Sequence, residues 1–382
     1  MSVRTQTELS NERCDGCPPS LSPLRQSVAK GKTYRVRKHN FTHVPVVDLS
    51  GVPLMLTSGK RARKLIESHQ ATPFWSKGVF CIRLNREPSA RSYQPVAVGV
   101  DPGSKREGIS VVSKTSDILN LQLHARTGVK KKIENRRIMR RGRRYRNTPC
   151  RQPRWNRTSL KKDRIVPSTK ARWGWKLRII RSLAKVIPIS YIVVEDIQAV
   201  TKEGQRKWNK SFSPLEVGKT WFYSKLEEIA PVSLKEGWET KELRDQYGLK
   251  KTSKKLAETF EAHCVDSWAL AADRLDLDRQ PMSKTLLCLA PLDFRRRSLH
   301  LQTPSKGNKR RRHGGTRTEG IRKGALVKSE KHGKCYLGGA SQNRVSLHSL
   351  ETGKRLTKSA KLGEENKVLG YNSIRFWKVN PE

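Results

Sequence analysis

Short apolar runs between residues 93 and 125 predict three β-strands. They read "PVAVGVDPG", "EGISVVSK" and "ILNLQLHA", and the Pro and Gly residues between the first two favour a turn, so we expect an antiparallel meander. Asp101 is the last residue of the first run, where a side chain can point out of the end of a sheet. On this stretch alone, an ordinary Asp-Pro-Gly turn explains the aspartate as well as a functional role does.

Residues 44–92 have the pattern of a small module. "VPVVDLSGVPLML" predicts two short strands around a Ser-Gly turn, "SGKRARKLIESHQ" predicts an amphipathic helix with a basic face, and "FCIRLNR" predicts another strand. Such a ββαβ unit is too small to bury a large core by itself.

Helical patterns follow, interrupted by one strongly apolar strand. "KLRIIRSLAKVI" and "VGKTWFYSKLEEIA" predict helices, and between them "ISYIVVEDIQ" predicts a strand that ends on Glu195 and Asp196. "KTSKKLAETFEAHCVDSWALAADRL" predicts one further helix, capped at Thr252 or Ser253. The last part of the chain is rich in Gly and basic residues, and its short runs "ALVKS", "KCYLGG", "RVSLHS" and "SIRFWKV" predict a small β-barrel or sandwich.

The charge of the chain points to a partner. Of 382 residues, 80 are Lys or Arg and 34 are Asp or Glu, which gives a formal net charge of +46. Such an excess repels itself in a compact protein, so we expect a polyanionic partner, most commonly nucleic acid. The length favours two or three modules. No apolar run approaches the roughly 20 residues of a membrane-spanning helix, and we expect neither a membrane partner nor secretion.

The seven cysteines are irregularly spaced, which favours reduced thiols and a cytoplasmic location. Cys14 and Cys17 form a single C-x-x-C pair. A zinc ribbon needs a second pair at suitable spacing and none follows, so we do not expect a structural zinc site.

Residues 126–178 carry a dense run of Lys and Arg with only two acidic residues, Glu134 and Asp163. The first part, 130–146, predicts a helix that is basic on nearly every face. A charge run is usually a solvated surface, but positive charge at this density has no internal partners. Four interleaved aromatic residues add surfaces for stacking: Tyr145, Trp155, Trp173 and Trp175. We therefore expect an arginine-rich helix that lies along a phosphate backbone.

Four residues from separate segments form a candidate catalytic group: Asp101, Glu195, His263 and Asp266. The first two end apolar strands, and the last two are three positions apart, hence on one face of the predicted helix. Clustered carboxylates are costly unless a cation neutralises them, and oxygen ligands suit Mg²⁺ or Mn²⁺ better than zinc. Two such ions about 4 Å apart would activate a water and stabilise the leaving oxygen of a phosphodiester. Taken alone, His263 is better explained as a core histidine. Its grouping with the three carboxylates favours a role in the catalytic group instead.

The same residues lie in motifs that resemble a known family. "VGVDPGSKREGISVV", "YIVVEDIQAV" and "AHCVDSWALA" are similar to the three split RuvC motifs of a ribonuclease-H-like nuclease, and "RRGRR" at 140–144 resembles its arginine-rich bridge helix. "GVPLML" at 51–56 resembles an N-terminal PLMP module, with Leu56 in place of the final proline. Together these motifs cover roughly residues 44–275 and resemble the transposon-encoded IscB group.

One departure narrows the resemblance. IscB proteins carry an HNH nuclease between the second and third RuvC motifs, whereas residues 197–262 contain no histidine and are too few for that domain. The chain therefore resembles IsrB, the relative without HNH. This implies an RNA-guided nickase that binds a large structured guide RNA and cuts the non-target strand of a double-stranded DNA target with a short flanking motif.

The fold implied by this resemblance is α/β: a ribonuclease-H-like RuvC core split by an arginine-rich bridge helix, with a small N-terminal PLMP module and a C-terminal β-rich domain. The divisions we expect are a basic flexible tail at 1–43, the PLMP module at 44–92, RuvC part I at 93–125, the bridge region at 126–178, RuvC parts II and III at 179–275, and a target-interaction domain at 276–382. A monomeric ribonucleoprotein in the bacterial cytoplasm, associated with the nucleoid, is the expected state.

The residue patterns and the resemblance together lead to expected roles for single residues. All four residues of the candidate group are catalytic, and Asp101, Glu195 and Asp266 bind Mg²⁺, or alternatively Mn²⁺. RNA binding is expected from the bridge arginines: Arg136, Arg137, Arg140, Arg141, Arg143, Arg144 and Arg146. Nucleic-acid binding is also expected from two later clusters: Arg295, Arg296, Arg297, Arg310, Arg311 and Arg312.

Two other functions remain as alternatives. A guide-independent, structure-specific DNA nuclease has little use for the bridge stretch or the basic C-terminal module. A catalytically silent RNA-binding protein does not need the four site residues, all of which are present.

Overall fold

The computed structural model of the chain describes residues 43–76, 79–126, 128–147, 165–196, 218–292, 317–318, 320–341, 344–371 and 373–380. Several predictions therefore lie outside the described residues: the tail at 1–42 with Cys14 and Cys17, and the arginine clusters at 295–297 and 310–312. None of the described helices is both long and apolar enough to cross a membrane.

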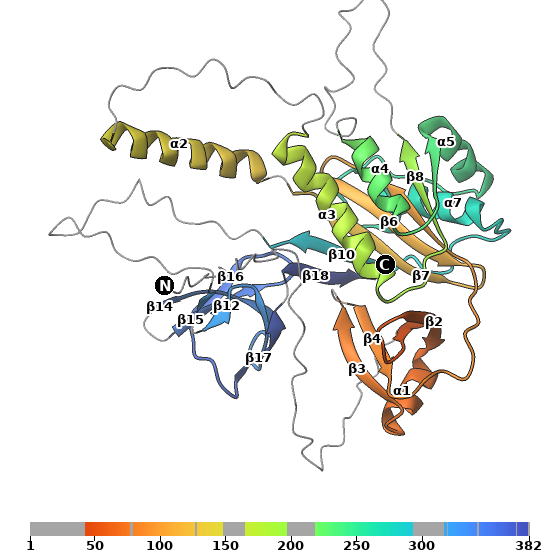
Figure 1. The fold of residues 1–382 in the computed structure, drawn as a ribbon, viewed down its shortest axis with the longest axis horizontal. Helices are drawn as coiled ribbons and strands as arrows, with labels where there is room; N and C mark the ends of the chain where they lie inside the picture. The colour runs from red at the N-terminus through yellow and green to blue at the C-terminus, as the bar shows by residue number, and fades with distance from the viewer. Residues whose placement is uncertain are drawn as a thin grey trace, which may run out of the picture. The chain divides into compact units, whose positions relative to one another are not determined.

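A seven-stranded mixed sheet, with the strand order β18-β10-β7-β6-β5-β8-β9, is the centre of the fold (Figure 1). Its strands are β5 (Val96–Asp101), β6 (Arg106–Ser113), β7 (Asp117–His124), β8 (Tyr191–Asp196), β9 (Val232–Glu236), β10 (Leu286–Pro291) and β18 (Ile374–Val379). Strands β5, β6 and β7 form the predicted antiparallel meander. Strand β8 lies parallel to β5 with Val194 opposite Val100, so the next residues, Glu195 and Asp101, end at the same edge.

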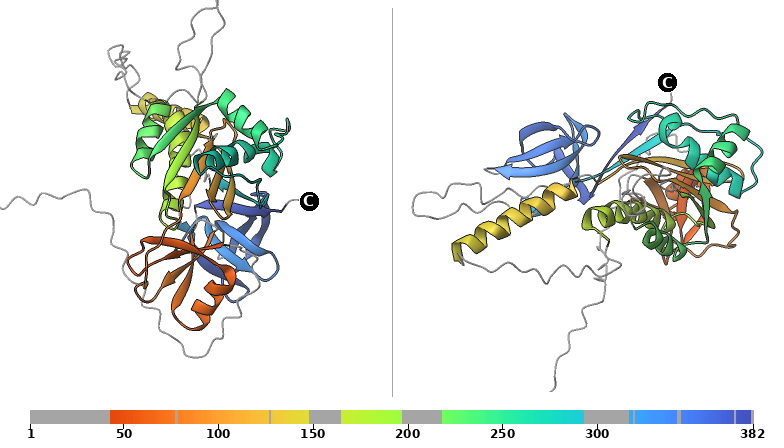
Figure 2. Two further views of the ribbon diagram at one scale, coloured as in Figure 1. Left: turned by 90° about the vertical axis from the view of Figure 1, so that its right-hand side faces the viewer. Right: turned by 90° about the horizontal axis from the view of Figure 1, so that it is seen from above.

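Helices cover both faces of this sheet (Figures 1 and 2). Residues alternate along β5: Val98 and Val100 pack into one core with α3 (Pro167–Ala184) and α4 (Lys219–Glu227). Ala97 packs into a second core with α7 (Val265–Arg274), whose Trp268 is fully buried. The period of two explains why this strand is apolar throughout, since both of its faces are covered. Asp101 follows the alternation and belongs to the α7 face.

Two glycines allow helices α6 (Phe260–His263) and α7 to lie close to the sheet. A Cβ atom on Gly99 would lie 1.7 Å from the carbonyl oxygen of Ser267, and one on Gly108 would lie 1.7 Å from that of His263. Neither distance is possible for real atoms, so only glycine permits this approach. The hydroxyls of Ser110 in β6 and Ser267 in α7 are 2.9 Å apart, and this hydrogen bond joins the strand to the helix.

A buried ion pair lies on the opposite face of β6. The ammonium of Lys176 in α3 is 3.0 Å from Oε1 of Glu107, and both side chains are almost fully buried. The same ammonium lies 4.2 Å from the ring centroid of Trp173, a cation–π contact. Trp173 and Trp175 are both buried in this core, so they are not the stacking surfaces expected from the sequence. Burial outweighs the attraction of Lys176 and raises the pKa of Glu107 to about 7.

The N-terminal module is a four-stranded sheet in the order β2-β1-β4-β3 with one helix. Its elements are β1 (His43–Val47), β2 (Pro53–Ser58), α1 (Gly59–Glu67), β3 (Ala71–Ser76) and β4 (Val79–Leu84). The pattern predicted ββαβ and did not include β3, because Pro73 interrupts it. A proline has no N–H for a central strand, but β3 lies at the edge, where the missing donor is tolerated.

A five-stranded antiparallel sheet, in the order β16-β15-β14-β13-β17, lies in the last part of the chain. Its strands are β13 (Ala325–Ser329), β14 (Gly333–Ser341), β15 (Arg344–Ser349), β16 (Arg355–Ala360) and β17 (Asn366–Tyr371). A separate two-stranded pair consists of β11 (Arg317–Thr318) and β12 (Ile321–Arg322). The expected barrel or sandwich does not include "SIRFWKV": this strand, β18, pairs antiparallel with β10 in the central sheet.

The prediction of a single helix over 251–275 is wrong: its first part is a loop, and the remainder is two helices separated at Cys264, so His263 and Asp266 do not share one helix. The described backbone is helical only in α6 and α7, and residues 251–259 precede them as a loop rather than a capped helical turn. The amide of Thr252 donates to the carbonyl of Glu261, 3.1 Å away, which folds the loop back onto α6. The polar run "KKTSKK" has no apolar stripe that could bury against the sheet, so nothing favours a helix there.

Candidate active site

Three carboxylates meet at one edge of the central sheet. Asp101 ends β5, Glu195 lies near the end of the adjacent β8, and Asp266 lies in the first turn of α7. One carboxylate oxygen from each residue lies within 4.8 Å of the others. The Asp266 side chain is 3% exposed and that of Asp101 is 13% exposed, so the cluster is largely withdrawn from water.

The fold explains why these carboxylates converge. Asp101 and Glu195 occupy alternate positions that face α7, and their strands are parallel neighbours. Gly108 is paired with Asp101 across β5 and β6, and its missing side chain lets the backbone of His263 approach. The chain turns at Cys264 between α6 and α7, and Asp266 then lies over the ends of both strands.

Two cationic side chains neutralise part of this negative charge. Nη1 of Arg244, in α5 (Gly237–Gln246), is 2.9 Å from Oδ1 of Asp266. The ammonium of Lys251, in the loop before α6, contacts Oδ2 of Asp266 and is 3.4 Å from Oδ2 of Asp101. Lys251 therefore bridges two carboxylates, as a metal ion would. Burial disfavours its charge, but the two aspartates outweigh burial, and the pKa of Lys251 lies above its usual value.

The pKa of Glu195 is far above its usual value. Burial, followed by the negative charge of Asp101 and a hydrogen bond shared with it, raises the pKa of Glu195 to about 9. Asp266 acts in the same direction, and Lys251 opposes it only in part. Without a further cation, Glu195 is therefore protonated at neutral pH, since two adjacent carboxylates in a dry site cannot both hold a charge.

His263 lies at the same edge, at the end of α6, and is 8% exposed. Its Nε2 is buried without a hydrogen-bond partner among the described residues. Burial lowers the pKa of His263, and Arg106 and Lys251 lower it further, against the opposing effect of Asp101. The imidazole is therefore neutral at pH 7, with one ring nitrogen available to a ligand, a water or a substrate.

The donor set fits a divalent cation with a preference for oxygen ligands. An octahedral Mg²⁺ or Mn²⁺ site has metal–oxygen distances near 2.1 Å, so opposite ligand oxygens are about 4.2 Å apart. The oxygens of Asp101, Glu195 and Asp266, within 4.8 Å of one another, need shifts of less than about 1 Å to meet that requirement. The ammonium of Lys251 must then move away, because it lies between two of the same carboxylates.

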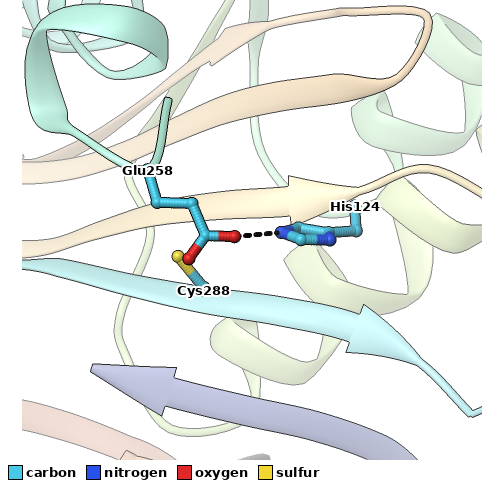
Figure 3. A group of neighbouring side chains, drawn as sticks. All are labelled: His124, Glu258 and Cys288. Atoms are coloured by element: carbon cyan, nitrogen blue, oxygen red, sulfur yellow. Dashed lines mark ion pairs between the residues drawn. The ribbon is translucent and has the colours of Figure 1, made fainter. Parts of the chain in front are cut away.

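A second group of metal-type side chains lies beside the first: His124 in β7, Glu258 in the loop before α6, and Cys288 in β10 (Figure 3). Nε2 of His124 is 3.5 Å from Oε1 of Glu258. The guanidinium of Arg106 contacts Nδ1 of His124 and lies 3.7 Å from the same glutamate oxygen. A cation here would lie beside Arg106, so charge repulsion disfavours a metal.

This second group instead connects the loop before α6 to the sheet. Oε2 of Glu258 accepts a hydrogen bond of 2.8 Å from Nε1 of Trp377 in β18, whose ring packs edge-on against His124. Burial and the positive charge of Arg106 lower the pKa of His124 to about 3, so the imidazole stays neutral. The contacts fix Glu258, five residues before His263 in the chain.

The other sequence-predicted residues lie apart from the carboxylate cluster. Asp196 belongs to the opposite face of β8, where its Oδ1 accepts hydrogen bonds of 2.8 Å from Lys219 and from Tyr223. The expected arginine-rich helix is α2 (Val129–Asn147), and four of its arginines are exposed: Arg136, Arg137, Arg140 and Arg141. Arg143, Arg144 and Arg146 belong to the same helix, and their side chains lie outside the described part of the structure.

Arg244 and Lys251 were not predicted from the sequence. Neither belongs to a motif, and the pattern assigned Lys251 to a helix, where it would not reach the sheet edge. The available signal was the absence of apolar periodicity in "KKTSKK", which favours a loop.

Comparisons with known proteins give one family match and one similar solved structure. A protein-family model described as RRXRR protein matches residues 44–209, less than half of the 382 residues. A search of curated proteins finds no match. Among solved structures, T. thermophilus RuvC in complex with a Holliday junction substrate is similar, with 14% identity and a TM-score of 0.27, over 47% of this chain and 96% of that one. The segment 44–209 contains Asp101, Glu195 and the sequence "RRGRR", and it is this segment that is similar to the RRXRR family.

Proposed function

We propose that this protein is a divalent-metal-dependent DNA endonuclease of the RuvC type, guided by RNA, that nicks one strand of its target. The convergence of Asp101, Glu195 and Asp266 at the edge of the central sheet is the observation that carries the proposal. A partly buried group of carboxylates that includes one residue with a strongly shifted pKa, here Glu195, is typical of a catalytic metal site.

The topology supports the nuclease class. The five neighbouring strands β7-β6-β5-β8-β9, with an antiparallel meander followed by two parallel strands, agree with a ribonuclease-H-like core. The acidic residues at the ends of β5 and β8 are consistent with the split RuvC motifs that the sequence resembles. The match of residues 44–209 to the RRXRR family is consistent with this assignment.

The residues of the site would divide the work of phosphodiester hydrolysis between metal binding and proton transfer. Asp101, Glu195 and Asp266 would hold Mg²⁺ or Mn²⁺, which when bound makes a water more acidic and offsets the charge of the phosphate. The neutral imidazole of His263 offers its unpartnered Nε2 near the scissile phosphate to accept a proton from the attacking water. Gly99 and Gly108 hold α6 and α7 against the sheet, which fixes the positions of His263 and Asp266.

The proposal that the nuclease is guided by RNA rests on the positive charge of helix α2. Helix α2 presents exposed arginines without a matching set of acidic residues in its own sequence, and a single-signed surface of this kind suits an RNA backbone. With base pairing between guide and target supplying the sequence choice, the protein itself needs only backbone contacts and a short flanking motif.

A plasmid assay tests the nuclease proposal. Protein purified with its copurifying RNA is incubated with a supercoiled plasmid that carries the matching target, in Mg²⁺ or in EDTA. We expect open circles in Mg²⁺ and no cutting in EDTA, because one metal-dependent centre cuts one strand. Rapid conversion to linear DNA would contradict the single centre, and cutting that is independent of the copurified RNA would contradict the guide.

Matched variants locate the activity. Asp101→Ala is expected to abolish nicking with little effect on RNA retention, since it removes a metal ligand and no phosphate contact. Asp196→Asn is the control. Asp196 follows Glu195 in β8 but lies on the face of the sheet opposite the carboxylate cluster, where it is bonded to Lys219 and Tyr223. Retained nicking by Asp101→Ala would overturn the assignment of the site.

A further inference from the structure

An exposed tryptophan lies next to the carboxylate cluster. Trp238 is the second residue of α5 and is 58% exposed, although tryptophan is usually well buried. The preceding residue borders the site directly: a Cβ atom on Gly237 would lie 3.5 Å from Oε1 of Glu195. Later in the same helix, Arg244 contacts Asp266. Helix α5 therefore runs alongside the cluster, with Trp238 at the end near Glu195.

The indole is held by its polar edge. Nε1 of Trp238 donates a hydrogen bond of 2.7 Å to Oε2 of Glu236, the N-cap residue of α5. The backbone amide of Glu236 in turn donates to Oε2 of Glu239, 2.6 Å away, which closes a capping box. Trp75, which is similarly exposed, is packed against Phe80 and Lys334, whereas no such ring or cation contact involves Trp238 among the described residues.

Positive charge follows at the other end of α5. The loop that begins after Gly248 carries Lys250, Lys254 and Lys255, all exposed, beside Lys251 at the carboxylates. Helix α5 itself carries exposed acidic residues, among them Glu242 and Asp245, so the positive charge comes from the loop. A phosphate backbone held by this loop would leave a base within reach of the exposed indole at the other end of α5. Positive charge combined with an aromatic ring is the usual composition of a surface that binds single-stranded nucleic acid.

We propose that Trp238 is a stacking platform for an unpaired base of the DNA strand that is cut. This inference rests on the proposed nuclease function and specifies its substrate. A base can lie flat on an indole only when it is not stacked inside a duplex, so the strand at the site is single-stranded next to the scissile phosphate. The site therefore accepts a displaced or unwound strand and disfavours an intact duplex.

Photocrosslinking tests the contact directly. Single-stranded oligonucleotides with 5-iododeoxyuridine at successive positions are bound to the full-length protein in EDTA, so that no cutting occurs, and are then irradiated. We expect a crosslink in the tryptic peptide "EGWETK", residues 236–241, from a base at one or two adjacent positions only. Crosslinks confined to other peptides, or spread evenly over all positions, would overturn the proposal.

Binding measurements provide a second readout. At raised salt, phosphate contacts weaken while stacking persists, so affinity for a short single strand is measured there. Trp238→Ala is expected to weaken binding by about 5- to 100-fold, and Trp238→Phe, which keeps a ring, to retain most of it. Trp75→Ala is the control and should leave the affinity nearly unchanged. Because Trp238 is mostly exposed, the melting temperature of Trp238→Ala should match that of the wild type, which excludes unfolding as the cause of a loss.

The two proposals fail in different ways. Plasmid nicking by the wild type together with unaltered binding and cutting by Trp238→Ala would refute the stacking platform and leave the nuclease intact. A position-specific crosslink at residues 236–241 without any metal-dependent cutting would support a contact between Trp238 and single-stranded DNA, and would refute the nuclease and any role of that contact in cutting.

Discussion

The ammonium of Lys251 lies where a metal ion is expected, between Asp101 and Asp266. Three carboxylates in a largely buried cluster repel one another, and each loses hydration. Lys251 and Arg244 offset part of that cost when no metal is bound. The same ammonium must compete with any divalent ion for the same oxygens, so a residue that stabilises the metal-free protein weakens metal binding.

Replacing Lys251 by Met should therefore change stability and metal affinity in opposite directions. In EDTA the variant should melt at a lower temperature than the wild type, because the carboxylates lose a counter-charge. Its affinity for Mn²⁺ should rise by about tenfold, which corresponds to about 1.4 kcal/mol. Calorimetric titration with Mn²⁺ and thermal melting in EDTA measure the two effects without any need for activity.

Lys235→Met is the matched control. Lys235 is about as exposed as Lys251 and contacts Glu239 and Asp273 rather than the cluster. It should leave Mn²⁺ affinity unchanged. An unchanged affinity in the Lys251 variant as well would mean that the ammonium does not occupy the metal position in solution.

The raised pKa of Glu195 predicts how the stability of the metal-free protein depends on pH. Its pKa is raised to about 9 in the folded protein, mainly by burial and then by Asp101, whereas an unfolded glutamate titrates near 4.5. Between these values the folded state holds a proton that the unfolded state has released, so stability falls as the pH rises. Glu195→Gln removes this titration. In EDTA, the melting temperature of the variant should therefore gain on that of the wild type from about pH 5 to pH 9.

Bound metal should reverse the difference in melting temperature between the wild type and Glu195→Gln at high pH. Bound Mg²⁺ favours the ionised carboxylate, so the wild type should recover stability at high pH in Mg²⁺ while Glu195→Gln should not. Glu107, whose pKa is also raised, titrates in both proteins and cancels in the difference. Parallel melting curves across the pH range, with and without Mg²⁺, would show that Glu195 is not part of a metal-linked cluster.

At the scale of elements, the contact between α6 and the sheet controls the site. Gly108 is paired with Asp101 and lies directly beneath the carbonyl of His263. Gly108→Ala would force α6 away from β6 and carry His263 and Asp266 with it. We expect a loss of about 1–3 kcal/mol in the free energy of unfolding, as for other overpacked positions, and weaker Mn²⁺ binding.

Gly174→Ala is the control for this change. Gly174 lies inside α3, and an added Cβ there would meet nothing within 4 Å. Alanine is the better helix former, so this variant should be more stable than the wild type by up to about 1 kcal/mol. Chemical denaturation of both variants gives the comparison. Equal stability of Gly108→Ala and the wild type would contradict the close approach of α6.

The elements that could be predicted from the sequence were those whose pattern reflects burial. Strands β5, β6 and β8 are rich in β-branched residues because both faces are covered, and their ends located Asp101 and Glu195 correctly. Strand β9 has the half-exposed sequence "VSLKE", and Pro73 interrupts β3, so neither gave a signal. Long-range pairing was the other limit: nothing local shows that β18 pairs with β10 rather than with its neighbours in the chain.

The same distinction applies to the candidate site. Asp101 and Glu195 end apolar runs, so periodicity alone predicts that they lie at strand ends. Asp266 was expected inside a longer helix, and its position in the first turn of α7 depends on the break at Cys264, which the pattern does not show. Lys251 and Trp238 lie in polar segments, and their positions depend on where α5 and its following loop pack. Those positions follow from tertiary structure, which a local pattern does not contain.

At the scale of the whole molecule, the formal charge of +46 remains to be neutralised. Some ion pairs of the described residues stabilise the core or the site, as those of Lys176 and Arg244 do. Others, such as those of Arg181 and Lys284, lie on the surface. Helix α2 carries exposed arginines on a sequence that has one acidic residue, Glu134. We expect this helix to contact RNA phosphates and to release condensed counterions on binding.

Replacing Arg140, Arg141, Arg143 and Arg144 by Ala tests this expectation through salt dependence. The affinity for the copurifying RNA should fall steeply with salt, and the log–log slope should become shallower in the variant by about two to four units, roughly 0.7–0.9 per lost phosphate contact. Replacing four lysines of the C-terminal region by Ala is the control: Lys354, Lys358, Lys361 and Lys367. These lie in or beside the five-stranded sheet and should change the slope much less. Filter binding at several salt concentrations gives both slopes. If both sets reduce the slope equally, α2 is generic positive surface, because the effect then depends on the number of charges and not on their place in the fold.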